Sequence, residues 1–377
     1  MTEFKTFSDK GSLCNYFASL GGWADPEKVV PLKGTNAHEV AVGPVHAGVI
    51  EPGHFRFQCM GEDVYNLQIF LGYQHRGVEE AIVRADGMIP RQIALAETCA
   101  GDTSVAAATA FAEIMERAFP ERFPSPTPEA LALRRLLIEL ERIANHTGDL
   151  GALAGDVAFL QTQAFSGRIR GEYLNMSALL CGNRFGRNAI IPGGVRVNLD
   201  DEKIQQLKDW IKRVRPELNR ALKLMFDNHT VCDRFDGTGV VSKETARAIG
   251  LVGMARRASE DFNGDVMARA LVRRIEIDEA HAKIATLLAG ELPSQSPTPC
   301  EEKSGEFFAV TSTVPAWRGP LVHAAAFTQD GRMIKYKIVD PSAHNWHGLQ
   351  WALRGEQISN FPICNKSFNL SYCGVDR

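Results

Sequence analysis

The chain has 377 residues, of which 45% are hydrophobic and 23% are charged, and its formal net charge at pH 7 is -3. That length exceeds a typical single domain, but one large core or two closely packed lobes can absorb it. The charge balance shows no Lys/Arg stripe, so no nucleic-acid surface is expected. No apolar run approaches the roughly 20 residues needed to cross a bilayer, and the first residues lack a signal-peptide core. We therefore expect a cytoplasmic protein that reaches a membrane only through partner subunits.

The cysteines follow no zinc-finger or disulfide-framework spacing, and we interpret most of them as small core hydrophobes in a reducing compartment. The eight cysteines are Cys14, Cys59, Cys99, Cys181, Cys232, Cys300, Cys364 and Cys373.

The first part of the chain is predicted to form an arm followed by a small sheet. Residues 1–37 are loosely patterned, with a helix indicated around Leu13–Leu20, and are expected to form an N-terminal arm against a partner. Residues 38–76 alternate between apolar and polar positions, which predicts a small antiparallel β unit with one buried face. Its expected strands are Glu39–Val42, Phe55–Cys59 and Val64–Leu71, with a turn at Gly61–Asp63.

Residues 77–292 carry helical periodicity and predict a helical bundle. One helix begins at Thr127–Glu129, where a capping residue precedes proline and an acidic residue. A second helix is expected over Asp200–Arg213, and Pro216 is expected to end or kink it. A third, long helix is expected over Gly264–Leu288.

Residues 293–377 are predicted to form a β-hairpin region and a tail that packs back on the bundle. Pro293–Gly305 is typical of a surface connection because it is rich in proline and serine. The elements expected after it are strands at Phe307–Val314, Leu321–Phe327 and Met333–Val339 and a helix around Trp346–Arg354. The fold class is therefore α+β and mainly α: a central helical bundle with small antiparallel sheets near the N-terminus and before the C-terminus. Residues 38–377 are expected to form one domain.

Two segments near opposite ends of the sequence correspond to paired cysteine motifs. Glu97–Asp102 corresponds to the last six positions of the frame E-R-x-C-G-x-C, and Ser367–Arg377 corresponds to S-F-D-P-C-x-x-C-x-x-R. Cys99 occupies the one ligand position that keeps a thiol, while Cys373 lies one residue out of register. The other three ligand positions are Asp102, Ser371 and Gly374.

Five further motifs occur between these segments or before them, in a consistent order. They are G-P-x-H at Gly43–His46, G-Y-x-H-R-G-x-E at Gly72–Glu79, L-E-R-x-x-N-H at Leu140–His146, an I-x-P-G-G-V type segment at Ile191–Val195 and D-P-S-x-x-N-W at Asp340–Trp346. Over nearly its whole length the chain resembles the large subunits of energy-converting (group 4) nickel-iron hydrogenases. It is equally similar to the hydrogenase-like large subunit of respiratory complex I.

The resemblance implies a hydrogenase-like scaffold without the nickel-iron centre. Soft sulfur donors bind and bridge nickel and iron, and a carboxylate, a hydroxyl and a missing side chain do not replace them. We therefore expect this chain to bind no metal or other cofactor itself. If the stretch from Cys99 to Asp102 is helical, both side chains share one face. A buried cysteine beside a helix-capping aspartate is the structural alternative.

The resemblance also implies roles for residues near the first motif. Arg91 corresponds to an arginine that the complex I family places beside a [4Fe-4S] cluster of the small partner subunit, where a cation favours the reduced cluster. A surface arginine is the alternative interpretation. His54, rather than His46, corresponds best to the quinone-binding histidine of complex I, since an imidazole can donate to a quinone oxygen. The tyrosine of that quinone site falls at Ser104, so half of the site is missing.

We predict cofactor binding for His46, His75 and Arg76. His75 and Arg76 would do so at a subunit interface, but the sequence is equally consistent with an ordinary pair of surface side chains at these two positions. Four polar residues further along the chain share one helical face, which suggests a network of hydrogen bonds inside the protein. The favoured interpretation is that this network serves the packing of the helical bundle. Its members are Glu141, Arg142, Asn145 and His146.

We predict a hydrogenase-like large subunit of a membrane-associated, complex-I-related oxidoreductase. It would receive electrons from a [4Fe-4S] cluster of a small iron-sulfur subunit and pass them to a quinone or another small acceptor. The predicted catalytic residues are His54, Arg91, Cys99 and Asp102. Complex-I-like hydrophilic subunits and antiporter-like membrane subunits are the further expected partners, at the inner face of the cytoplasmic membrane.

Three alternatives remain open at the level of sequence. The first is a non-catalytic coupling subunit, which an apolar, filled cavity at the old metal position would support. The second is reduction of a sulfur compound at Cys99, if a nearby cation lowers the pKa of its thiol. The third is genuine hydrogenase activity.

Overall fold

The computed structural model describes residues 1–24, 26, 32–47, 50–293 and 304–377. Its elements follow the predicted order of strands, helices and strands, and the prediction of an α+β, mainly α fold is confirmed. Within the described residues, no helix combines the length and apolar character needed to cross a membrane.

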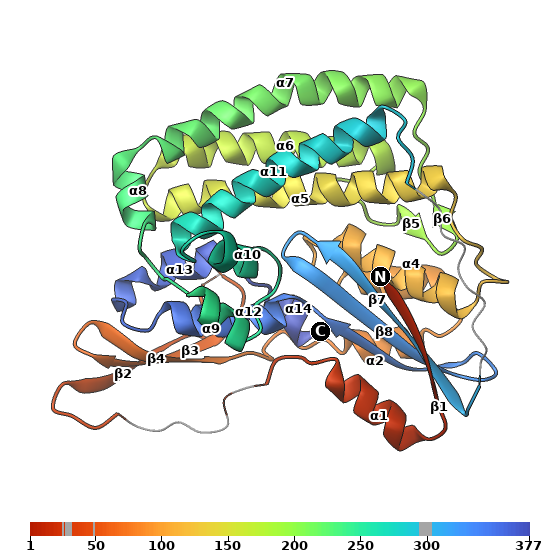
Figure 1. The fold of residues 1–377 in the computed structure, drawn as a ribbon, viewed down its shortest axis with the longest axis horizontal. Coiled ribbons are helices and arrows are strands. Elements are labelled where there is room, and N and C mark those ends of the chain that lie inside the picture. The colour runs from red at the N-terminus through yellow and green to blue at the C-terminus, as the bar shows by residue number, and fades with distance from the viewer. Residues whose placement is uncertain (25, 27–31, 48–49, 294–303) are drawn as a thin grey trace.

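Four long helices form the bundle and lie side by side in Figure 1: α5, Pro128–Asp156; α6, Leu160–Cys181; α7, Asp201–Phe226; and α11, Val266–Leu288. The predicted start of α5 is confirmed, because the Thr127 side chain accepts a hydrogen bond from the Ala130 amide. Helix α7 continues through Pro216 for ten more residues, to Phe226, so Pro216 does not end the helix, and a kink at this proline stays a prediction.

A four-stranded antiparallel sheet lies beneath the bundle, in the order β1-β7-β8-β9. Its strands are β1, Thr2–Phe7; β7, Phe307–Ala316; β8, Gly319–Thr328; and β9, Met333–Val339. Two helices pack on it: α2, Val78–Arg84, against β9, and α4, Ser104–Ala118, against β7 and β8. Helix α3, Ile89–Glu97, packs against α2 and α4.

The N-terminal segment differs from the expected arm, because strand β1 pairs antiparallel with β7 from Thr2 opposite Ser312 to Phe7 opposite Phe307. Helix α1, Lys10–Ser19, covers the predicted helical stretch. It buries Leu13 and Phe17 in a small apolar cluster with alanines of β7 and β8. Burial of these apolar side chains attaches the segment to the sheet of its own chain.

The predicted β unit near the N-terminus is present as a second antiparallel sheet, β2-β3-β4. Its strands are β2, Ala37–Val42; β3, His54–Met60; and β4, Asp63–Phe70. A two-residue hairpin, β5 at Ile190–Ile191 and β6 at Gly194–Val195, interrupts the helical region. Shorter helices complete that region: α8, His229–Phe235; α9, Lys243–Ala248; and α10, Gly253–Asp261.

The C-terminal part returns beneath the bundle. It contains α12, Ser342–Ala352; the 3-10 helix η1, Ile358–Asn360; α13, Phe361–Phe368; and α14, Cys373–Asp376. Helix α13 contacts α5 and α11, and one continuous cluster of buried apolar side chains extends from Phe55 to Val375. Most of the predicted connection Pro293–Gly305 lies outside the described residues.

Candidate functional site

The first cysteine motif forms a turn between two helices. Helix α3 ends at Glu97 and α4 begins at Ser104, so the stretch from Cys99 to Asp102 is not helical. The two side chains therefore do not share a helical face, which the sequence predicted only if this stretch were helical. The turn is held from outside, since the Asn145 amide donates to the Asp102 carbonyl at 2.8 Å. This places Cys99 and Asp102 against the second motif segment.

Asp102 forms a two-point ion pair with Arg318, which lies between β7 and β8. Arg318 donates from Nη1 to Oδ1 at 2.9 Å and from Nη2 to Oδ2 at 2.6 Å. The Arg318 side chain is 7% exposed and that of Asp102 is 34% exposed. Burial alone would raise the pKa of Asp102, but the charge and hydrogen bonds of Arg318 outweigh it and hold that pKa below its usual value. The guanidinium of Arg318 therefore neutralises the carboxylate of Asp102, which stands at one of the four cysteine positions of the motifs.

Two further contacts orient the Arg318 guanidinium. Its Nε donates to the Asn369 carbonyl at 2.7 Å, and its plane lies over the Trp317 ring, 3.9 Å from the centroid. The sequence interpretation did not single out Arg318. The signal present in the sequence is a tryptophan, an arginine and a glycine between two apolar strand patterns, where a turn is expected.

Cys99 is buried and its Sγ lies 3.9 Å from the Gly374 carbonyl. Burial raises the pKa of the Cys99 thiol, and the nearby Asp340 carboxyl raises it further. A reactive thiolate needs the opposite environment, a cation or a helix N-terminus that lowers the pKa. Cys99 is therefore placed as a neutral core thiol, which disfavours sulfur chemistry at this residue.

The space beside Gly374 is already filled by other groups. Its amide donates to the Ser371 hydroxyl at 2.9 Å. A Cβ atom at this position would lie 2.7 Å from Oδ2 of Asp340 and 2.8 Å from Oγ of Ser371. A cysteine side chain here requires its neighbours to move.

The residues at the four former ligand positions do not fit a nickel-iron centre. One buried thiol, one ion-paired carboxylate, one hydroxyl that hydrogen-bonds to backbone and one glycine replace the four thiolates that such a centre needs. Within the described parts of the chain, no group of three or more His, Cys, Asp or Glu residues is arranged to hold a metal ion.

Gly374→Ala is expected to destabilise the protein by about 1–3 kcal/mol, because the added methyl group overpacks the space beside Asp340 and Ser371. Urea denaturation of the full chain measures the change. Gly167→Ala in α6 is the matched control: a Cβ there meets nothing within 4 Å, and we expect it to stabilise the helix by up to about 1 kcal/mol. Equal denaturation midpoints for the two variants would show that the position beside Asp340 has room.

An open cavity of about 480 Å³ lies beside this former metal position. Two of its side chains, Glu51 and Cys373, interact: the Cys373 thiol donates to Glu51 at 3.5 Å. Burial, and then the Glu51 carboxylate, raises the pKa of Cys373 to about 11. The lining residues are Ile50, Glu51, Gly101, Asp102, Arg318, Lys366, Asn369, Leu370, Ser371, Tyr372 and Cys373. We call this cavity the acceptor pocket, after the function that we propose for it.

The two histidines predicted near the N-terminus close the base of the loop between β2 and β3. His46 donates from Nε2 to the Gly53 carbonyl at 2.7 Å, and His54 lies with Nδ1 3.4 Å from the Gly43 carbonyl. Neither histidine is among the described residues that line the acceptor pocket. The Ser104 hydroxyl, at the position of the missing tyrosine, is buried and donates to the Gly101 carbonyl at 3.2 Å.

His75 and Arg76 join the two motif segments. His75 donates from Nδ1 to the Asp376 carbonyl at 2.7 Å. Arg76 donates to the carbonyls of Thr98 and Cys99 at 2.8 and 2.9 Å. These contacts give the pair a positioning role, while their predicted role in cofactor binding stays a prediction.

Arg91 lies exposed on α3, near the start of that helix. It is not one of the described residues around the acceptor pocket, and of the four predicted catalytic residues only Asp102 lines that pocket. A surface position is compatible with contact to a partner subunit, and the role of Arg91 beside a cluster stays a prediction.

The polar face of α5 anchors neighbouring elements, as the packing interpretation implies. Glu141 accepts a hydrogen bond from the Val105 amide at 2.8 Å, at the start of α4. Arg142 donates to the Pro315 carbonyl at 2.7 Å, at the end of β7. His146 contacts Glu276 of α11 at 2.7 Å.

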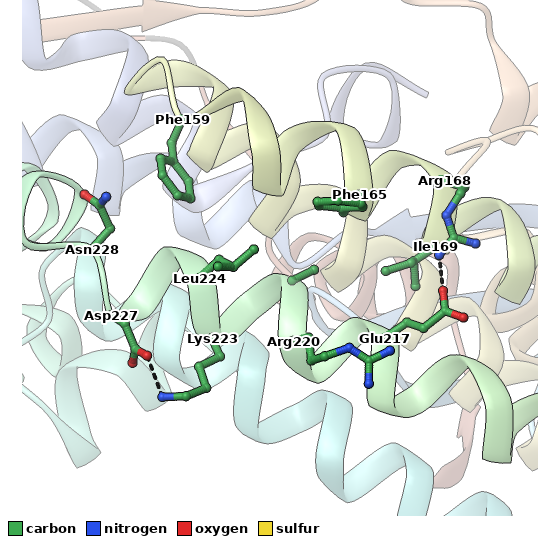
Figure 2. Close-up of a pocket in the computed structure, with 11 residues that line it drawn as sticks. Phe159, Phe165, Arg168, Ile169, Glu217, Arg220, Lys223, Leu224, Asp227 and Asn228 are labelled. Atoms are coloured by element: carbon green, nitrogen blue, oxygen red, sulfur yellow. Dashed lines mark hydrogen bonds and ion pairs between the residues drawn. The ribbon is translucent and has the colours of Figure 1, made fainter.

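A second large groove, of about 670 Å³, runs between α6 and α7 (Figure 2). Phe159, Phe165 and Leu224 point toward it, and ion pairs Arg168–Glu217 and Lys223–Asp227 lie along its edge. Among the described residues that line it, none belongs to the two motif segments. The acceptor pocket is therefore the candidate site.

Comparison with known proteins agrees with this geometry. Residues 156–262 match the family of the 49 kDa subunit of respiratory-chain NADH dehydrogenase. The chain is 27% identical to hydrogenase-4 component G of Escherichia coli, covering 91% of this chain and 62% of the relative. It is 25% identical to NADH-quinone oxidoreductase subunit 4 of Thermus thermophilus, covering 94% and 97%. The chain thus spans less than two thirds of the hydrogenase-4 component and nearly the full length of the Thermus protein.

The fold has a solved counterpart in the membrane-bound sulfane sulfur reductase, an archaeal respiratory membrane complex. The TM-score is 0.77 at 22% identity, over 91% of this chain and 99% of the other. The fold and the two converging motif segments are those of a hydrogenase-like scaffold in which three of the four cysteine positions hold other residues. The chain is thus similar, over most of its length, both to energy-converting hydrogenase large subunits and to complex I 49 kDa subunits.

Proposed function

We propose that this chain is the electron-delivering large subunit of a membrane-associated oxidoreductase complex that works without nickel. Electrons come from a [4Fe-4S] cluster of a small partner subunit, as the family resemblance implies, and reduce a small acceptor in the acceptor pocket. The observation that carries the proposal is that pocket: it is open, polar and formed by both motif segments. The complex would lie on the inner face of the cytoplasmic membrane, held there by its membrane subunits.

The shape and lining of the acceptor pocket argue against the non-catalytic alternative. A purely structural subunit is expected to fill the old metal position with apolar side chains, since an apolar core is more stable than a buried ion pair. Here Asp102, Arg318 and Lys366 face a cavity of about 480 Å³. Retained charge beside a cavity is instead typical of a site that binds a polar molecule.

A small polar acceptor fits this pocket better than a quinone. The quinone contacts implied by the resemblance require His54 and a tyrosine at the position of Ser104, and neither His54 nor Ser104 is among the described residues that line the pocket. The lining offers cations, Arg318 and Lys366, and a thiol, Cys373. Because the carboxylates of Glu51 and Asp102 lie beside the two cations, the lining is balanced in charge and suits a small polar or sulfur-containing molecule.

The second candidate is reduction of a sulfane sulfur or disulfide compound, favoured by Cys373 in the pocket wall. Two electrons and two protons cleave the S–S bond and leave two S–H groups. The archaeal protein of the same fold is named as a sulfane sulfur reductase. Cys373 replaces Cys99 as the candidate for contact with the sulfur compound, because Cys373 lines the pocket and Cys99 does not. With its pKa raised to about 11 the Cys373 thiol stays protonated at neutral pH, so it would contact the sulfur compound as a hydrogen-bond donor rather than attack it as a thiolate.

The test is elemental analysis for nickel and iron on the complex purified from its native host, with assays for hydrogen evolution and for reduction of polysulfide and of a soluble quinone. We expect iron without nickel, no hydrogen, and reduction of an acceptor. Cys373→Ala is expected to lower polysulfide reduction at least tenfold, whereas Cys14→Ala, which removes an exposed thiol of α1, leaves the rate unchanged. Nickel in equimolar amount with hydrogen evolution would overturn the proposal.

A further inference from the structure

Glu141 is a carboxylic acid placed close to the acceptor pocket but outside its wall. One carboxyl oxygen, Oε2, accepts a hydrogen bond from the Val105 amide at 2.8 Å. The other, Oε1, is shielded from solvent and has no hydrogen-bond partner in the described part of the structure. A shielded carboxyl oxygen without a partner is costly unless it is protonated or contacts water.

A small cavity of about 20 Å³ lies between this carboxyl group and the Gly101–Asp102 turn, whose other side lines the acceptor pocket. Glu141, Gly101 and Asp102 line the small cavity, and Gly101 and Asp102 also line the acceptor pocket. A volume of this size accommodates one water molecule when polar partners surround it. Glu141 and the acceptor pocket are thus separated by the wall that Gly101 and Asp102 form.

The small cavity also reaches the surface of the molecule. Arg184 and Phe185 line it, and both are exposed on the loop after α6, with Phe185 at 40%. A proton lost from Glu141 can therefore be replaced from solvent along this loop.

The charged groups that face Glu141 come from each element around it. They are Asp102 from the turn before α4, Arg142 from α5 itself, Arg170 from α6 and Arg184 from the following loop. Burial, with the Asp102 carboxylate adding to it, raises the pKa of Glu141 to about 8, although the amides of Val105 and Ala106 and the charge of Arg142 act in the opposite direction. Glu141 therefore carries a proton at neutral pH, while its neighbour Asp102 stays ionised beside Arg318.

We propose that Glu141 is a proton carrier for the acceptor pocket, passing protons through water held between its carboxyl group and the Gly101–Asp102 turn. This inference rests on the proposed function. Reduction of the acceptor takes two electrons, which the [4Fe-4S] cluster of the partner supplies, and two protons. Each proton leaves the Glu141 carboxyl, crosses the small cavity and ends on the reduced acceptor. Solvent then reprotonates the Glu141 carboxylate before the next transfer.

The first test is the pH profile of acceptor reduction, with polysulfide as acceptor, in the purified complex. The wild-type rate is expected to fall as the pH rises through about 8, because Glu141 loses the proton that it donates. Glu141→Gln keeps an amide oxygen for the Val105 amide but carries no acidic proton. We expect its rate at pH 7 to fall at least about tenfold and the dependence near pH 8 to disappear. Glu141→Asp should restore part of the rate.

The matched control is Glu129→Gln, an exposed position at the start of the same helix, which should keep the wild-type rate and profile. If the role of Glu141 were only structural, Glu141→Gln would lower the rate of acceptor reduction by the same factor at every pH. If Glu141→Gln keeps both the rate and the pH profile of an active wild-type complex, the inference is wrong although the proposed function stands. A wild-type complex that reduces none of the acceptors overturns the proposed function instead.

Infrared difference spectroscopy of the complex measures whether the Glu141 carboxyl group is protonated, and it does not require catalytic turnover. The wild type should show the carbonyl band of a protonated carboxylic acid at pH 7, lost in Glu141→Gln and titrating near pH 8. Absence of that band at pH 7 would overturn the proton-carrier role whatever the activity.

Discussion

Arg318→Ala is expected to destabilise the protein by about 2–3 kcal/mol and to abolish acceptor reduction. Removing one partner of a buried ion pair costs about 3–5 kcal/mol, and the value here is lower because Asp102 is 34% exposed toward the acceptor pocket. The variant also loses the hydrogen bond from Nε to the Asn369 carbonyl, which positions the second motif segment. Urea denaturation of the full chain and the acceptor assay on the complex measure the two effects.

Two further variants separate charge from geometry at this site. Arg318→Lys keeps the positive charge but not the two-point contact with Asp102, and it should recover part of the stability. Arg332→Ala, an exposed position beyond the other end of β8, is the control and should change stability by less than about 0.5 kcal/mol. An Arg318→Ala variant as stable as this control would mean that the ion pair contributes nothing.

Arg134→Ala is expected to destabilise the protein more, by about 3–5 kcal/mol, because it leaves Glu116 buried without a counter-ion. The two side chains are 3% and 7% exposed, and their closest atoms are 2.5 Å apart. Arg134 also donates to the carbonyls of Ile191 and Gly194, and Glu116 accepts from the Gly193 amide. The pair thus connects α4 and α5 to the β5–β6 hairpin, and the variant should expose that hairpin to hydrogen exchange.

Arg135→Ala is the natural control, since Arg135 is the next residue of α5 and is exposed. We expect a change within about 0.5 kcal/mol. A second variant, Glu116→Leu with Arg134→Met, removes both charges together and should recover most of the lost stability, because no unpaired charge remains. Failure of the double variant to recover would assign the loss to packing rather than to the unpaired carboxylate.

Much of the fold followed from local patterns. Alternation predicted β3 and β4, a threonine, a proline and a glutamate predicted the start of α5, and the motif order predicted the hydrogenase-type scaffold. These predictions succeeded because strand and helix periodicities are properties of neighbouring residues. Strand β1 was missed because its partner β7 lies some three hundred residues later in the sequence, so pairing rather than local alternation defines it.

The candidate site also combines features that the sequence predicted with features that it did not. The amino-acid sequence alone determined that three of the four ligand positions lack a thiol, since that is a matter of residue identity in a motif. It did not disclose that Arg318, 216 positions from Asp102, neutralises one of these positions. It also did not show that Cys99 is buried while Cys373 faces the acceptor pocket. Burial, charge pairing and cavities depend on which distant segments pack together, and only the tertiary structure decides that.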